Sequence, residues 1–178
     1  LSAESDRGCA LFAASYLESA LSDLLYVVLV SDNKIENDLF EGTAPLSSFS
    51  SRIKMAYYIG CISTSCRREL DLIRRIRNDF GHNADPISFD TPLISQRCKT
   101  LNYSYHLKEA SARDHFTASV IKILASIYHA TYSTPVHQPK PDDTPSEEDK
   151  QRNRKFVEEL GAKLKTEEHE GPTTSEQS

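Results

Sequence analysis

The chain has no tryptophan, a single methionine and only six glycines among its 178 residues. Its four cysteines, Cys9, Cys61, Cys66 and Cys98, form no C-x-x-C pair and have no histidine at the spacing of a zinc site. We therefore expect no metal and no cofactor, and interpret the cysteines as small buried residues in a reducing compartment. No stretch alternates between apolar and polar residues for long enough to indicate a strand.

Long hydrophobic runs are missing as well. The longest, residues 24–30, has seven residues, whereas a helix that spans a membrane needs about twenty. The first residues show no charged segment followed by an apolar segment and a cleavage site, so no signal peptide is indicated. We predict a cytoplasmic protein without a membrane span.

An excess of positive charge is also absent. Residues 1–132 carry 14 Lys and Arg against 15 Asp and Glu, and residues 133–178 carry 7 against 11. Proteins that bind duplex DNA normally use many Lys and Arg contacts to phosphate. The basic cluster between Arg67 and Arg77 is partly offset by Asp71, so we interpret it as a solvated, ion-paired face. Without a basic helix-turn-helix pattern, direct reading of DNA is disfavoured.

The most informative stretch is residues 63–82, S-T-S-C-R-R-E-L-D-L-I-R-R-I-R-N-D-F-G-H. At about 100° per residue its apolar residues fall on one arc, which predicts a helix with one face in the core. Arg77 lies inside that arc. Because its guanidinium cannot lose its charge, it needs a carboxylate or several carbonyl oxygens nearby. Glu69 on the same arc, or an acid on another helix, is the expected partner.

Arg77 and His82 also form an R-N-x-x-x-H pattern. On an unbroken helix the two side chains point about 140° apart and cannot share a ligand. Gly81 is a candidate helix terminator, and a break there would bring the imidazole back toward the guanidinium. Whether the two residues form a site therefore depends on how the helix ends.

The fold class that the sequence predicts is all-α, a helical bundle of about five to six helices. Besides the helix at 63–82, apolar spacing and cap residues predict helices at 3–30, 35–40, 48–60, 92–101 and 110–132. Residues 24–30 are apolar on nearly every side, which indicates burial in the bundle or against a second subunit.

We predict two parts, a helical domain at 1–132 and a tail at 133–178. The tail begins with a stiff Pro-rich linker and continues as an acidic segment that is largely disordered or partly helical. Its residues 146–166 can form a charged helix with a thin apolar stripe, stable only when docked. The stripe consists of Phe156, Val157, Leu160 and Leu164.

Four ordered blocks resemble the mannitol operon repressor family, and the likeness covers about residues 4–130. The blocks are D-R-G at 6–8, L-F-E-G at 39–42, P-L-S-S-F-S-S-R-I-K at 45–54 and D-L-I-R-R-I-R-N-D-F-G-H at 71–82. The family-motif residues taken from them are Ser47, Ser48, Phe49, Arg52, Lys54, Asp71, Arg74, Arg77, Asn78, Asp79, Phe80 and His82. The resemblance implies an all-α domain that negatively regulates mannitol uptake and catabolism. The family lacks a recognisable DNA-binding motif, which leaves a protein partner and an operator as alternatives.

The R-N-x-x-x-H element also resembles the motif of HEPN domains, all-α dimeric modules of which some are ribonucleases. By that resemblance Arg77 would contact the scissile phosphate, His82 would handle a proton of the ribose 2′-hydroxyl, and Asn78 would orient one of them. The structural alternative makes Arg77 a buried ion pair, Asn78 and Asp79 the end of the helix, and His82 a partner of the helix dipole.

From these observations we expect a non-enzymatic transcriptional regulator, a helical homodimer that acts through a protein partner. Direct DNA binding is disfavoured. The alternative hypothesis is a HEPN-type, metal-independent ribonuclease, in which Arg77, Asn78 and His82 act on RNA across a dimer interface.

Overall fold

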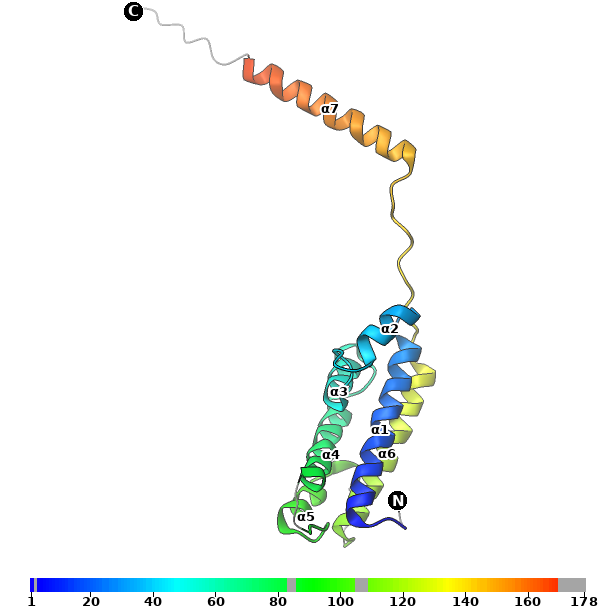
Figure 1. Cartoon of the computed structure of the whole chain (residues 1–178), viewed down its shortest axis with the longest axis vertical. Coiled ribbons are helices and arrows are strands. Elements are labelled where there is room, and N and C mark those ends of the chain that lie inside the picture. Colours follow the sequence, from blue (N-terminus) through cyan, green and yellow to red (C-terminus); the bar gives the residue numbers. More distant parts are fainter. Residues whose placement is uncertain (2, 83–85, 105–108, 170–178) are drawn as a thin grey trace, which may run out of the picture. The chain divides into compact units, whose positions relative to one another are not determined.

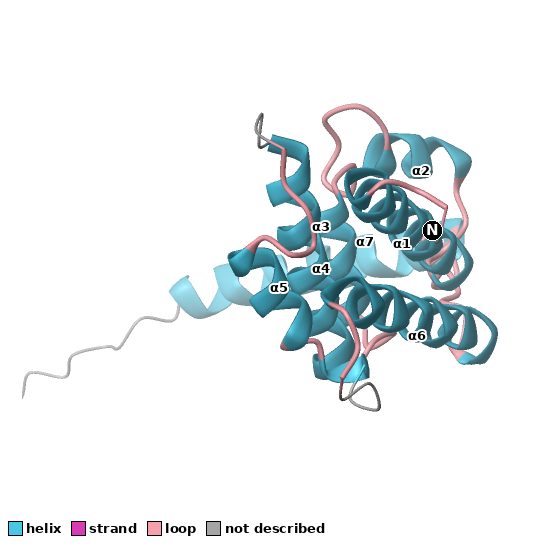
Figure 2. Cartoon of the chain, turned by 90° about the horizontal axis from the view of Figure 1, so that it is seen from below, coloured by secondary structure: helices cyan, strands magenta, loops and turns pink. Residues whose placement is uncertain are grey.

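The structure is a computed structural model, and it describes residues 1, 3–82, 86–104 and 109–169. These residues form seven α-helices and one 3₁₀ turn, with no strand among them (Figure 2). The predicted all-α class is confirmed, and the helix number is slightly above the expected five to six. The chain divides into two compact units, Leu1–Pro139 and Lys140–Ser178.

The first unit is a bundle around two long helices, α1 (Asp6–Val28) and α6 (Ala112–Ser133), which pack along each other. On one side of this pair lie α3 (Phe49–Tyr58), α4 (Thr64–His82) and α5 (Pro92–Lys99), as Figures 1 and 2 show. α4 packs against four other helices, α1, α3, α5 and α6.

Two shorter elements complete the first unit. α2 (Asn33–Phe40) follows α1, and its Phe40 ring lies 4.4 Å from the ring of Tyr26. A 3₁₀ turn (Asn102–Ser104) connects α5 with α6 and packs against α6. Both elements contribute buried side chains, Phe40 from α2 and Ser104 from the 3₁₀ turn.

α1 is the one helix, among the residues described, that is long and apolar enough to cross a membrane by length and composition. The longest apolar run, residues 24–30, does not indicate such a helix, because it has only seven residues. In the bundle 44% of the qualifying window is buried, and α1 packs against α3, α4 and α6. Burial of one face against three helices accounts for the apolar residues on that face.

The helix ends follow from local chemistry. Ser48 and Ser51 form a capping box at the start of α3, with Ser51 N–H donating to Ser48 Oγ at 3.1 Å. Ser63 Oγ accepts from Cys66 N–H at 3.1 Å before the first turn of α4. Gly42 and Gly60 follow α2 and α3 with φ of 59° and 80°, a region that favours glycine.

The second unit consists of α7 (Glu147–His169) and the segment that precedes it. The apolar stripe expected at 146–166 is present on this helix, and its four side chains are between 48% and 65% exposed. The stripe is therefore uncovered within its own unit.

Candidate functional site at the end of α4

The core face of α4 is the one that the periodicity predicts. Its buried residues are Cys66, Glu69, Leu70, Ile73, Ile76 and Phe80. The Phe80 ring lies 5.0 Å from Phe89, whose ring lies 5.1 Å from Phe116 on α6. This aromatic series holds the last turns of α4 against α6, so the polar residues on its other faces have fixed positions.

Glu69 is not the partner of Arg77, so that expectation is wrong. Its side chain is buried at 2% exposure, and its Oε1 accepts from the N–H of Asn102 at 2.9 Å and from Asn102 Nδ2 at 3.1 Å. Its Oε2 accepts from the N–H of Tyr103 at 3.4 Å. Both carboxylate oxygens therefore bind the free N–H groups at the start of the 3₁₀ turn.

Arg77 is half-buried and does not form the buried ion pair expected from its place on the arc. Its Nη1 donates to Asn78 Oδ1 at 3.1 Å, and the described residues place no carboxylate within 4.0 Å of it. The long side chain carries the guanidinium from the edge of the core face out to the surface. The charge therefore remains in contact with a solvent-accessible cavity.

Gly81 does not end α4, because the helix continues through it to His82. A Cβ at Gly81 would lie 3.8 Å from Leu11 Cδ2, so the glycine permits close packing against α1 without a turn. On this unbroken helix Arg77 and His82 point in directions about 140° apart. Within the chain the two side chains therefore lie on different sides of α4.

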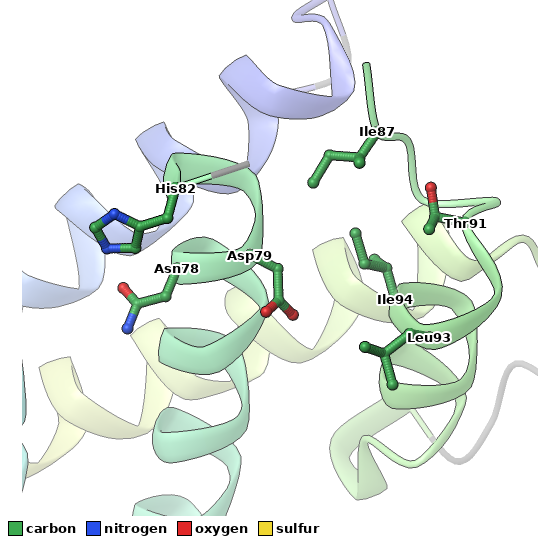
Figure 3. Close-up of a pocket in the computed structure, with 7 residues that line it drawn as sticks. All are labelled: Asn78, Asp79, His82, Ile87, Thr91, Leu93 and Ile94. Carbon is green, nitrogen blue, oxygen red and sulfur yellow. The ribbon is translucent and has the colours of Figure 1, made fainter. Parts of the chain in front are cut away.

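Two cavities flank the end of α4, and Asn78 lines both. The first has a volume of about 370 Å³ and is lined by Asn78, Asp79, His82, Ile87, Thr91, Leu93 and Ile94. In Figure 3 Asn78 and His82 lie on one side of α4, while Asp79 points toward Leu93 and Ile94. Asp79 also forms an ion pair with Arg97 on α5, which joins the two helices beside this cavity.

The second cavity, with a volume of about 290 Å³, is bounded by α1, α3 and α4. It is lined by Glu18, Ser48, Phe49, Ser50, Arg74, Arg77 and Asn78. The structure thus brings Arg77 together with Asn78 and the first turn of α3, and places His82 in the other cavity. In the described residues no three His, Cys, Asp or Glu side chains are grouped so that they could hold a metal ion.

Most other family-motif residues have structural contacts. Ser47 Oγ donates to the carbonyl of Ala44 at 2.7 Å, and Phe49 is buried. Arg52 donates through Nε to the carbonyl of Leu46 at 2.8 Å. Lys54 is exposed, in contrast to these three.

Two residues of this region carry no sequence signal. Glu18 on α1 lines the second cavity and pairs with Arg52 Nη1 at 3.3 Å, across 34 positions of the chain. Arg97 reaches Asp79 from α5. Pairs this far apart can be found only when the helices are already packed, because no local spacing relates them.

No protein-family model matches the chain, and no curated protein matches it. Among solved structures it is similar to a chain in the X-ray structure of the MtlR-HPr complex from Escherichia coli, with a TM-score of 0.59. The two share the same fold. The alignment covers 71% of this chain and 92% of the other at 18% identity. The fold implied by the resemblance to the mannitol operon repressor family is therefore confirmed.

Proposed function

We propose that this chain is a cytoplasmic transcriptional regulator related to the mannitol operon repressor, and that it acts by binding a partner protein. The observation that carries the proposal is the fold, which matches a chain from the MtlR-HPr complex over nearly all of that chain's length. That structure is a complex between two proteins. A protein partner is accordingly the first class of ligand to test here.

The ion pairs of the bundle support a protein partner over direct DNA reading. Asp71 pairs with Arg67 at 3.2 Å and with Arg74 at 3.8 Å, and Arg113 pairs with Asp6 at 2.7 Å. The single carboxylate of Asp71 thus offsets part of the basic cluster on α4, and the other ion pair joins α1 to α6. A binding surface for duplex DNA needs several cations facing the phosphates together.

The solvent-facing side of α1 supports a homodimer. Phe12, Tyr16, Tyr26 and Val27 are between 39% and 59% exposed. At about 100° per residue the four fall within a sector of about 100° that borders the buried face and also holds the exposed Ser19 and Asp23. Two exposed apolar pairs of this kind, one in each half of the helix, fit contact with a second subunit.

A binding experiment tests the choice of partner. We expect calorimetry to show saturable binding when the purified full chain is titrated with the HPr protein of its own organism. In parallel, mobility shifts with operator DNA at low and moderate salt should show only weak, sequence-independent retention. Tight, sequence-specific DNA binding by the chain alone would refute partner-dependent action.

Light scattering tests the dimer. We expect a dimer mass at micromolar concentration and a monomer mass for the double variant Phe12→Lys with Tyr16→Lys, because two charges in an apolar interface are costly. Tyr132→Lys is the control, since Tyr132 is 88% exposed on α6. A monomer mass for the unmodified chain would contradict this part of the proposal.

A further inference from the structure

The two longest blocks that resemble the repressor family meet in the second cavity. Ser48, Phe49 and Ser50 come from the block at 45–54, and Arg74, Arg77 and Asn78 come from the block at 71–82. The first group forms the opening turn of α3, and the second lies on adjacent turns of α4. Polar groups from separate elements therefore face a common space of about 290 Å³.

Arg77 supplies a fixed positive charge with spare hydrogen-bond donors. An arginine has five N–H donors in a planar fork. In the described residues one of these donates to a protein acceptor, the neutral Oδ1 of Asn78. Because that hydrogen bond uses the amide oxygen, it also orients the Asn78 side chain beside the guanidinium. The remaining donors are available to an anion in the cavity.

Arg74 adds a second guanidinium one turn away. Its Nε is buried and has no hydrogen-bond partner among the described residues. The nearest carboxylate oxygen, Asp71 Oδ1, is 3.8 Å from it, which is too far for a hydrogen bond. Arg67 Nε on the same helix is likewise buried without a hydrogen-bond partner in the part of the chain that the structure describes, and it does not line the cavity, so Arg74 contributes its charge to the site.

The one acid in the lining is balanced from outside the cavity. Glu18 Oε1 accepts from Arg52 Nη1 at 3.3 Å, and Arg52 is not among the lining residues. Arg74 and Arg67 share the single carboxylate of Asp71, and among the described residues no carboxylate pairs with Arg77. The site therefore keeps an excess of positive charge, which the N-terminal end of α3 reinforces.

We propose that this cavity binds a phosphoryl group, with Arg74 and Arg77 as the charged donors and Asn78 as a positioning residue. Planar guanidinium groups match the oxygen atoms of a phosphate, and two of them offset a dianion. The volume admits a phosphate with a small organic part. The site does not depend on the regulatory function proposed above, and it excludes His82, which lines the other cavity.

Titration of the full chain with inorganic phosphate, at constant ionic strength and with calorimetric detection, tests the site. Arg77→Gln and Arg74→Gln should each weaken binding about tenfold or more, the effect of losing one charge-assisted hydrogen bond. Arg75→Gln is the matched control, because Arg75 is exposed on the same helix and does not line the cavity. It should change the affinity less than about twofold.

Circular dichroism establishes whether each variant is folded. Because Arg74 and Arg77 are replaced separately, the test remains decisive if one of the two variants does not fold. The proposal would be overturned if all three variants bound phosphate as tightly as the unmodified chain, or if the unmodified chain did not bind phosphate. Glycerol 3-phosphate and a phosphoserine peptide, titrated side by side, distinguish the two sources of the group. Tighter binding of glycerol 3-phosphate would identify a small phosphate ester as the ligand. Tighter binding of the peptide would identify a phosphorylated protein side chain.

Discussion

Glu69 shows how one side chain can join elements that the sequence does not relate. Its carboxylate is almost fully buried on α4, and it satisfies two backbone N–H groups at the start of the 3₁₀ turn, 33 and 34 residues later. A buried carboxylate is stable only when hydrogen bonds replace its water. The pair of contacts therefore fixes the 3₁₀ turn to the second turn of α4.

Replacing Glu69 tests that role. Glu69→Ala leaves the N–H groups of Asn102 and Tyr103 without their acceptor, so we expect a loss of about 2–3 kcal/mol in the free energy of unfolding. Glu69→Gln keeps one acceptor oxygen and should lose less. Urea denaturation followed by circular dichroism measures both variants. Equal stability of all three proteins would show that water replaces the carboxylate without cost.

Because the thiols of Cys66 and Cys98 are buried, we predict that the free energy of unfolding falls at alkaline pH. Burial raises the pKa of Cys66 to about 11 and that of Cys98 to about 12, from an ordinary value of 9.0. Because the folded pKa is higher than the unfolded one, the stabilisation is fully present below pH 9. It is lost as the pH rises through the folded values, since the unfolded chain releases the protons first.

We therefore expect the free energy of unfolding to decrease more steeply above pH 9 in the unmodified chain than in a Cys98→Ala variant. The difference should reach about 2 kcal/mol near pH 10.5. Chemical denaturation at a series of pH values, with a reductant present, measures it. Parallel pH profiles for the two proteins would show that Cys98 is not protected from ionisation by the fold.

At the scale of the element, a substitution at Gly81 tests whether this glycine ends α4 or lies inside it. A helix terminator with positive φ resists replacement by alanine, whereas a glycine inside a helix is stabilised by it. Gly81 lies inside α4, and a Cβ there would meet Leu11 Cδ2 at an ordinary 3.8 Å. We expect Gly81→Ala to raise the free energy of unfolding by up to about 1 kcal/mol.

Thermal unfolding of Gly81→Ala beside the unmodified chain measures the change. Gly60→Ala is the contrasting variant, because Gly60 has φ of 80° and its replacement should destabilise the bundle by about 1 kcal/mol. Destabilisation of both variants to a similar extent would mean that α4 ends before Gly81.

The helices could be predicted from the sequence because their signals are local. The serines at 48 and 63 and the glycines at 42 and 60 lie where the structure begins and ends helices. The core face of α4 follows from its period. The partners of the charged residues on α4 cannot be derived in this way. A helical wheel gives the direction of each Cβ, but not the position of the end of a long side chain. Glu69 thus faces the 3₁₀ turn, and Arg77 reaches a cavity.

At the scale of the whole molecule, the two units differ in how they can become stable. The bundle buries a continuous core from six helices and the 3₁₀ turn. In the second unit Phe156, Val157, Leu160 and Leu164 of α7 are exposed, and acidic residues fill its first turn. A helix with this thin stripe has little tertiary stabilisation of its own, so its helicity depends on propensity and on ion pairs between successive turns.

The ribonuclease alternative requires a second subunit, because a single chain does not bring Arg77 and His82 together. The two line different cavities, so a shared phosphate would need Arg77 from one subunit and His82 from another. We expect the purified chain to leave single-stranded RNA intact in the presence of EDTA, and Arg77→Ala and His82→Ala to behave identically. Gel analysis of labelled RNA after long incubation measures this. Cleavage by the unmodified chain that both folded variants lose would instead establish a composite site across a dimer.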